Sequence, residues 1–320
     1  MSGLAEGVPD LDSATGSRFS LVSYLPTYAA VAFLAVLVAG GAPGGRFDPA
    51  RAHDRLAALG GAELAAVVLG IVLLAVVLHP LQLPLVQLLE GYWPGPLRWL
   101  TAAGVSRQRT RRSALESQAD ASRLSARQRD DPAARRAVLE AAWRLRRRFP
   151  PADLLLPTAL GNALRAMEYD AGSAYGADTV AWWPRLYVVL GEQLRAVVDD
   201  RRDQLDATCR LGATGAAVAV VTVPLLWRSG WWLAVALVPL AVAVVSYRAA
   251  VTAAVAYGEA VRTAFDLHRF DLPTHLHLGL PGTPAEELTT NRRLTRFWLQ
   301  GVPMSDVAFE HQPDAGGHDH

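Results

Sequence analysis

The sequence offers little of the chemistry that cysteine and lysine supply. Cys209 is the single cysteine among 320 residues, which excludes a disulfide within the chain and any metal site built from several cysteines. The chain contains no lysine, so all 31 basic residues are arginine. Without lysine there is no G-x-x-x-x-G-K-[ST] loop, and nucleotide-binding functions of that class are excluded.

Apolar residues are abundant, and they are collected into long runs. Hydrophobic residues make up 51% of the chain, and the mean hydropathy is +0.17, which is high for a soluble protein. Runs of this length are typical of membrane-spanning helices rather than of a globular core. The sequence therefore predicts an all-α integral membrane protein with four spans, at residues 21–42, 64–89, 211–227 and 231–247.

The first two runs each leave a question open. A cleaved signal peptide is the alternative interpretation of residues 21–42, but Arg18 is the only basic residue before the run, and the run is long for a signal. The second run is longer than a bilayer core. We expect Pro80 and Pro84 to bend it, so that its last part lies along the membrane surface.

The last two runs predict a tight hairpin. Only the tripeptide at residues 228–230 separates them, and antiparallel helices joined so closely must pack together. Trp227, Trp231 and Trp232 would then lie at a membrane interface. The small residues of "GATGAAVA" at 212–219 would allow close approach of the two backbones.

The placement of arginine predicts the orientation. Of the 31 arginines, 20 lie between the second and third runs, and positively charged loops stay in the cytoplasm. We therefore expect a multi-pass protein of the cell membrane with both termini cytoplasmic. The predicted organisation is a flexible tail (1–20), two spans with an interfacial segment (21–100), a cytoplasmic helical domain (101–210), a transmembrane hairpin (211–256) and a cytoplasmic segment with a disordered tail (257–320).

Residues 106–149 carry a strong positive charge. They read as two polar helices broken at 130–132, with 13 arginines against 5 acidic residues. A solvated helical hairpin beside the membrane explains this charge, because topology alone places arginine there. Contact with anionic lipid headgroups is a second interpretation. Nucleic acid is not an expected partner, since no aromatic residues are interleaved for base stacking.

The stretch "GNALRAMEYDAGSAYGADTVAWWPRL" at 161–186 is the least generic part of the chain. A helix should begin at Thr158, whose hydroxyl can cap the first turn. Further along this helix, Arg165 and Glu168 are three residues apart and can pair. Glycines then break this helix, and Asp178 or Thr179 can cap the next one. The second helix leads directly towards the third apolar run.

Three interpretations of this stretch remain open: a structural clasp, a ligand site and a catalytic site. Glu168 and Asp178 could form an acid/base pair, but no nucleophile lies near them in the sequence. In the structural interpretation, polar groups satisfy one another and the backbone at a helix junction. We predict no catalytic residue, and a structural or ligand clasp made of Asn162, Arg165, Glu168, Tyr175, Asp178, Trp183 and Arg185.

This stretch also resembles a known pattern. The residues "LPTALGNALRAMEYD" and "YGADTVAWWPRLY", with the motif GNxLRxxE…YGxD…WPRL, are similar to a stretch of uncharacterised bacterial multi-pass membrane proteins. Those proteins have two spans on either side of a cytoplasmic region. The resemblance covers about 30 residues and implies a membrane protein without assigning an activity or any site residue.

The C-terminal part predicts structure more clearly than chemistry. His275 and His277 would lie on one side of a strand as half of a metal site, but the sequence shows no clear third ligand. We therefore expect no metal and no cofactor. Thr283, Pro284 and Glu286 form the beginning of a short helix with a capping box.

The spans are almost free of ionisable residues, which argues against a transporter of four helices. The sequence favours a non-enzymatic, membrane-anchored interaction or regulatory protein with a protein partner not identified by the sequence. The alternative is an oligomeric ion channel or membrane-permeabilising effector gated by the cytoplasmic domain. Its pore would need several copies, with Thr222 or a hydrophobic constriction facing the axis.

Overall fold

The computed structural model of the chain describes residues 16–78, 82–93, 95, 98–129, 132–304 and 309–310. Regular structure in these residues is helical, as predicted, and β pairing is limited to one bridge between Leu278 and Phe309. Of the two predicted bend positions, Pro80 lies outside the described residues, whereas Pro84 lies within the helix Gln82–Glu90. Most of the predicted N-terminal tail and the last ten residues of the chain also lie outside the described residues. The main helices are α1 (Gly16–Ala39), α2 (Pro49–Ala57), α3 (Gly61–Leu78), α4 (Gln82–Glu90), α5 (Arg98–Arg129), α6 (Pro132–Arg148), α7 (Ala159–Asp170), α8 (Thr179–Val189), α9 (Glu192–Leu226), α10 (Leu237–His268), α11 (Asp271–His275) and α12 (Pro284–Gln300).

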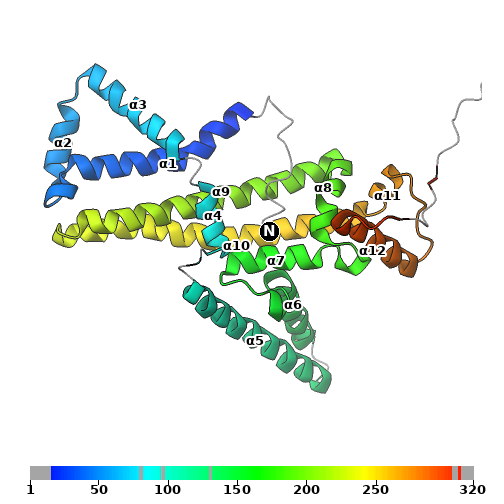
Figure 1. The fold of residues 1–320 in the computed structure, drawn as a ribbon. Coiled ribbons are helices and arrows are strands. Elements are labelled where there is room, and N and C mark those ends of the chain that lie inside the picture. The colour runs from blue at the N-terminus through cyan, green and yellow to red at the C-terminus, as the bar shows by residue number, and fades with distance from the viewer. Residues whose placement is uncertain are drawn as a thin grey trace, which may run out of the picture.

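Helices α9 and α10 form the predicted hairpin and run the length of the molecule (Figure 1). In the described part of the chain, Glu192–Leu226 and Gly230–His268 are long and apolar enough to cross a membrane. Counting the bent pair α2 and α3 as one broken span adds a third. Within the predicted first span, Leu25–Ala39 forms an apolar stretch of α1 that is shorter than Glu192–Leu226 and Gly230–His268. Four separate spans therefore remain a prediction.

The hairpin turn differs in detail from the expectation. Residues Gly230–Ala236 form a 3₁₀ helix, η6, rather than the first turns of an α-helix. Gly230 reverses the chain with φ at 62°, a left-handed conformation that suits glycine. Trp231 and Trp232 stack with ring centroids 4.0 Å apart, so two of the three predicted tryptophans meet at this turn, while Trp227 is exposed.

Small residues set the separation of α9 and α10. A Cβ added to Gly215 would lie 3.0 Å from both the Ala243 nitrogen and the Pro239 oxygen. Gly212 similarly faces Ser246 and Tyr247. The close backbone approach predicted from residues 212–219 is confirmed.

Helices α1, α2 and α3 form an arm beside the apolar half of this pair (Figure 1). A buried cluster of Leu37, Ala42, Phe47 and Leu226 joins the arm to the hairpin turn. The Phe47 N–H also donates to Ser229 Oγ at 2.9 Å. Helix α2 lies between the first two predicted spans. It forms because Asp48 caps it, accepting from the Ala50 nitrogen, and Pro49 occupies its first position.

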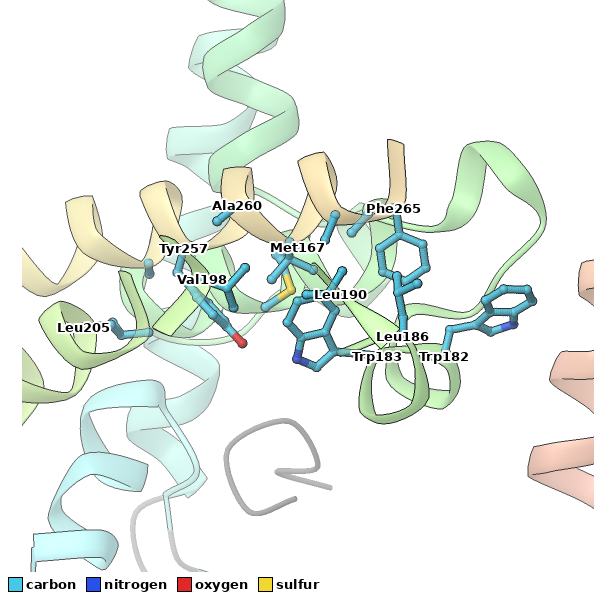
Figure 2. Close-up of a cluster of buried hydrophobic side chains, with 14 of the residues drawn as sticks. Met167, Trp182, Trp183, Leu186, Leu190, Val198, Leu205, Tyr257, Ala260 and Phe265 are labelled. Atoms are coloured by element: carbon cyan, nitrogen blue, oxygen red, sulfur yellow. The ribbon is translucent and has the colours of Figure 1, made fainter. Parts of the chain in front are cut away.

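The other helices gather around the polar half of α9 and α10. Helices α5 and α6 form the predicted hairpin, which projects from the body (Figure 1). Helices α7 and α8 pack on α9 and α10 through the main core, shown in Figure 2. Trp183 stacks on Phe265 at 6.4 Å, and Trp182 is fully buried. The predicted domain boundary at 210/211 falls inside α9, which continues through it without a break.

Candidate functional site

Asn162 fixes the chain where it enters α7. Its side chain is fully buried and makes three hydrogen bonds with the preceding loop. It accepts from the Leu156 nitrogen at 2.8 Å, and it donates to the carbonyls of Leu156 (2.9 Å) and Thr158 (2.8 Å). Thr158 caps the helix as predicted, accepting from the Gly161 nitrogen. Asn162 is therefore a structural residue.

Tyr175 connects the turn after α7 to two other elements. Its hydroxyl donates to Asp266 of α10 at 2.6 Å, and its carbonyl accepts from Asn291 of α12 at 2.8 Å. The Arg269 guanidinium lies 4.4 Å from the centre of the tyrosine ring. These contacts join segments that are about 90 and 116 residues away in sequence.

The residues of α8 face α12. Asp178 caps α8, accepting from the Ala181 nitrogen at 2.9 Å as predicted. Its own backbone nitrogen and the Trp182 indole both donate to Thr295. The Arg185 guanidinium lies 4.4 Å from the centre of the Trp298 ring and donates to the Ala181 carbonyl. Trp183 points the other way, into the core.

The structure thus brings together only one pair of the predicted clasp residues by their side chains. Arg165 and Glu168 approach to 3.3 Å on α7, as the spacing predicts. Asn162 and Asp178 bind nearby backbone groups and do not join this pair. The reason is the turn at 171–178, which separates α7 from α8 and directs their polar groups to different neighbours.

A second ionic cluster was missed by the sequence interpretation. Asp170 accepts from Arg146 of α6 at 2.7 and 2.9 Å and from Arg262 of α10 at 3.1 Å. Glu259 pairs with both Arg262 and Arg147. The cluster joins α6, α7 and α10. Asp170 lies in the quoted stretch, but its partners come from distant segments, so no local spacing indicates the cluster.

Arg165 and Glu168 line a small, partly open cavity of about 70 Å³, here called the carboxylate pocket. It lies where α4, α7, α9 and α10 meet. Three carboxylates line it: Glu90 at the end of α4, Glu168, and Asp206 on α9. Arg165 Nε is buried without a hydrogen-bond partner in the described part of the chain, so it can donate to an occupant. The remaining polar lining groups are Tyr92, Arg202, Cys209 and Tyr257.

Glu90 is the carboxylate most affected by this pocket. Burial raises its pKa from 4.5 to about 7, and the negative charges of Glu168 and Asp206 act in the same direction. Burial also raises the pKa of Glu168, although Arg165 opposes that change. Glu90 can therefore exchange a proton near neutral pH. The sequence signal was weak: Glu90 directly follows an apolar run and Asp206 precedes another.

The pocket is also tied to the backbone around it. Thr158 Oγ1 donates to the Glu90 carbonyl at 2.7 Å, which links the end of α4 to the beginning of α7. A Cβ on Gly161 would lie 1.9 Å from the same carbonyl, so only glycine fits there. A movement of the Glu90 backbone would therefore displace the first turn of α7.

His275 and His277, considered above as half of a metal site, do not lie side by side on a strand. His275 ends α11, with its Nδ1 2.8 Å from the Asp271 carbonyl, and His277 follows with φ at 55°. The expected strand is not formed at these residues. Within the described residues, no group of three histidine, cysteine or acidic side chains could hold a metal ion.

Comparison with known proteins adds no assignment. No protein-family model, curated protein or solved structure matches the chain. The resemblance of residues 156–187 to bacterial multi-pass membrane proteins therefore stays a prediction.

Proposed function

We propose that this protein is a non-enzymatic, multi-pass membrane protein whose helical domain acts on the cytoplasmic side as an interaction or regulatory module. The observation that carries the proposal is the continuity of α9 and α10. Each helix passes unbroken from the apolar half of the molecule into the core of the helical domain. A change in that domain is therefore transmitted to the membrane helices without a flexible joint.

The carboxylate pocket supplies a point at which such a change can begin. Its lining includes residues of α4, which follows the apolar helix α3, and of α9, whose second half is the third predicted span. Loss of a proton at Glu90 adds a third negative charge beside Glu168 and Asp206, against two positive charges in the lining, Arg165 and Arg202. Repulsion among the three carboxylates loosens the junction of α4, α7 and α9.

Hydrogen exchange of the protein in lipid nanodiscs tests this function. After correction for intrinsic exchange, we expect faster exchange in α4 and the first turns of α7 at pH 8 than at pH 6, with an accompanying change in residues 211–247. Glu90→Gln should remove the pH difference. Glu140→Gln, on exposed α6, is the matched control and should behave like the wild type. A response confined to α4 and α7 would refute transmission to the hairpin.

One observation favours the alternative, an oligomeric channel. Helix α3 exposes apolar side chains around its surface, including Leu69 (58%) and Val77 (70%), which another copy could cover. Thr222, the expected pore-lining residue, is instead fully buried and donates to the Val218 carbonyl at 2.7 Å. It cannot face an axis between copies in this arrangement.

Native mass in nanodiscs and ion flux from liposomes separate the two functions. The regulatory proposal expects a monomer or dimer and no ion release between pH 6 and 8. A closed ring of four or more copies that conducts ions would make the channel the better interpretation.

A further inference from the structure

A second and larger cavity, of about 550 Å³, opens where the apolar halves of α9 and α10 end. Its apolar wall is formed by the small residues Gly212 and Ala216 of α9 with Ala243 and Val244 of α10. Beyond this wall the lining of α10 continues through Tyr247 and Arg248, the first polar residues after the apolar run, to Val251 and Thr252. The cavity, here called the arginine groove, therefore extends from apolar surface to polar surface.

Three arginines converge on the polar end of this groove from three helices. They are Arg111 of α5, Arg148 at the end of α6, and Arg248 of α10. All three are exposed, and none forms an ion pair with another described residue. Their sequence neighbours behave differently: Arg112 pairs with Glu116 at 2.7 Å, and Arg147 pairs with Glu259. The groove thus gathers three arginines from three helices for which the described residues supply no ion-pair partner.

The backbone around the groove adds to this preference for an anion. Helix α7 begins at Ala159, which lines the groove, and the N-terminus of a helix carries a partial positive charge. The Tyr247 hydroxyl accepts from the nitrogens of Ala159 and Leu160, at 3.1 and 3.4 Å. That hydroxyl keeps its own hydrogen for donation to a ligand.

We propose that the arginine groove binds an anionic membrane lipid. The phosphate lies among Arg111, Arg148 and Arg248, whose guanidinium groups match phosphate oxygens in geometry and charge. An acyl chain follows the apolar wall between α9 and α10. Basic pockets between membrane helices are known to suit anionic headgroups in this way. The inference rests on the placement of the hairpin in a bilayer and not on the regulatory role.

The apolar wall distinguishes a lipid from a free anion. Inorganic phosphate would use the three arginines but leave the surface of Gly212, Ala216 and Val244 in contact with water. A lipid satisfies both ends of the groove, because each buried methylene group adds to binding. Binding should therefore require the charged headgroup and the chain together.

Titration of short-chain lipids into the full-length protein in neutral detergent tests this site. Dioctanoyl phosphatidylglycerol should bind, whereas dioctanoyl phosphatidylcholine and inorganic phosphate should bind weakly or not at all. Changing Arg111, Arg148 and Arg248 together to Gln should weaken phosphatidylglycerol binding roughly 100-fold, since each basic residue at a membrane surface contributes about fivefold. Ala216→Phe should weaken it as well without removing any charge.

The control variant changes Arg107, Arg109 and Arg136 to Gln, which removes the same amount of charge from the hairpin of α5 and α6. These side chains are exposed and do not line the groove. The control should bind phosphatidylglycerol as the wild type does. An equal loss in the control would show diffuse attraction rather than a site, and phosphate binding as tight as lipid binding would show a free-anion site. If the triple variant does not fold, Arg248→Gln alone should still weaken binding by about fivefold.

Discussion

The carboxylate pocket and the arginine groove both lie along α9 and α10, but they differ in size, in exposure and in the sign of the charge that lines them. The carboxylate pocket is small and only partly open, and its acidic groups lie in partly buried positions, so it favours the protonated form of Glu90. The arginine groove is larger and open, and water can reach its three guanidinium groups. Partial burial raises the pKa of a carboxyl group, so that it binds a proton near neutral pH. Exposed guanidinium groups stay charged and accessible, so that they can bind an external anion.

The largest expected effect comes from adding a methyl group to Gly161, which lines the carboxylate pocket. Gly161→Ala would force a methyl group against the Glu90 carbonyl, 1.9 Å away, so α4 and α7 must separate. We expect a loss of about 2–3 kcal/mol in the free energy of unfolding, as for other overpacked sites. Chemical denaturation in detergent measures it. Gly70→Ala on α3, where nothing lies within 4 Å, should leave stability unchanged or slightly higher.

Breaking the Arg165–Glu168 pair should have a smaller effect that depends on which partner is removed. Arg165→Gln leaves the Glu168 carboxylate beside Glu90 without its cation, and we expect a loss of about 1–2 kcal/mol for this partly exposed pair. Glu168→Gln removes one of the negative charges that raise the pKa of Glu90. That variant should lose less stability and shift the Glu90 titration to lower pH. Equal losses in the two variants, with an unchanged titration, would contradict the pocket electrostatics.

The free energy of unfolding should fall as pH rises towards the pKa of Glu90 in the carboxylate pocket. The folded-state pKa of Glu90, about 7, exceeds its ordinary value of 4.5, so folding favours the protonated form. This contribution is greatest at low pH, declines from about pH 4.5 and is lost above pH 7. Between pH 6 and 8 the wild type should lose about 1 kcal/mol, allowing for partial solvent screening. Glu90→Gln should flatten this dependence, and an unchanged slope would contradict it.

The smallest effect is expected where a buried polar group already has its partner. Thr222→Val removes a hydroxyl whose hydrogen bond lies within its own helix, to the Val218 carbonyl. The variant should change stability by less than about 1 kcal/mol and leave liposome permeability unaltered. A clear change in ion flux would instead support the channel alternative.

Sequence patterns predicted the features that depend on near neighbours. The caps at Thr158, Asp178 and Thr283 are where the sequence indicates, and the Arg165–Glu168 pair follows from a spacing of three. The tight hairpin of α9 and α10 follows from two apolar runs and a three-residue separation. In each of these cases the residues that interact are close in the chain or share one helix face.

Tertiary structure alone decided where the polar groups meet. Glu90 and Asp206 are far apart in sequence, and so are Arg111, Arg148 and Arg248, yet each set converges on one cavity. The arginine excess in residues 106–149 indicates the sign of the charge but not which arginines line a common cavity. Composition and periodicity determine helices and their apolar faces through local backbone physics. Which side chains share a cavity depends on how those helices cross, and that is fixed by packing across the whole chain.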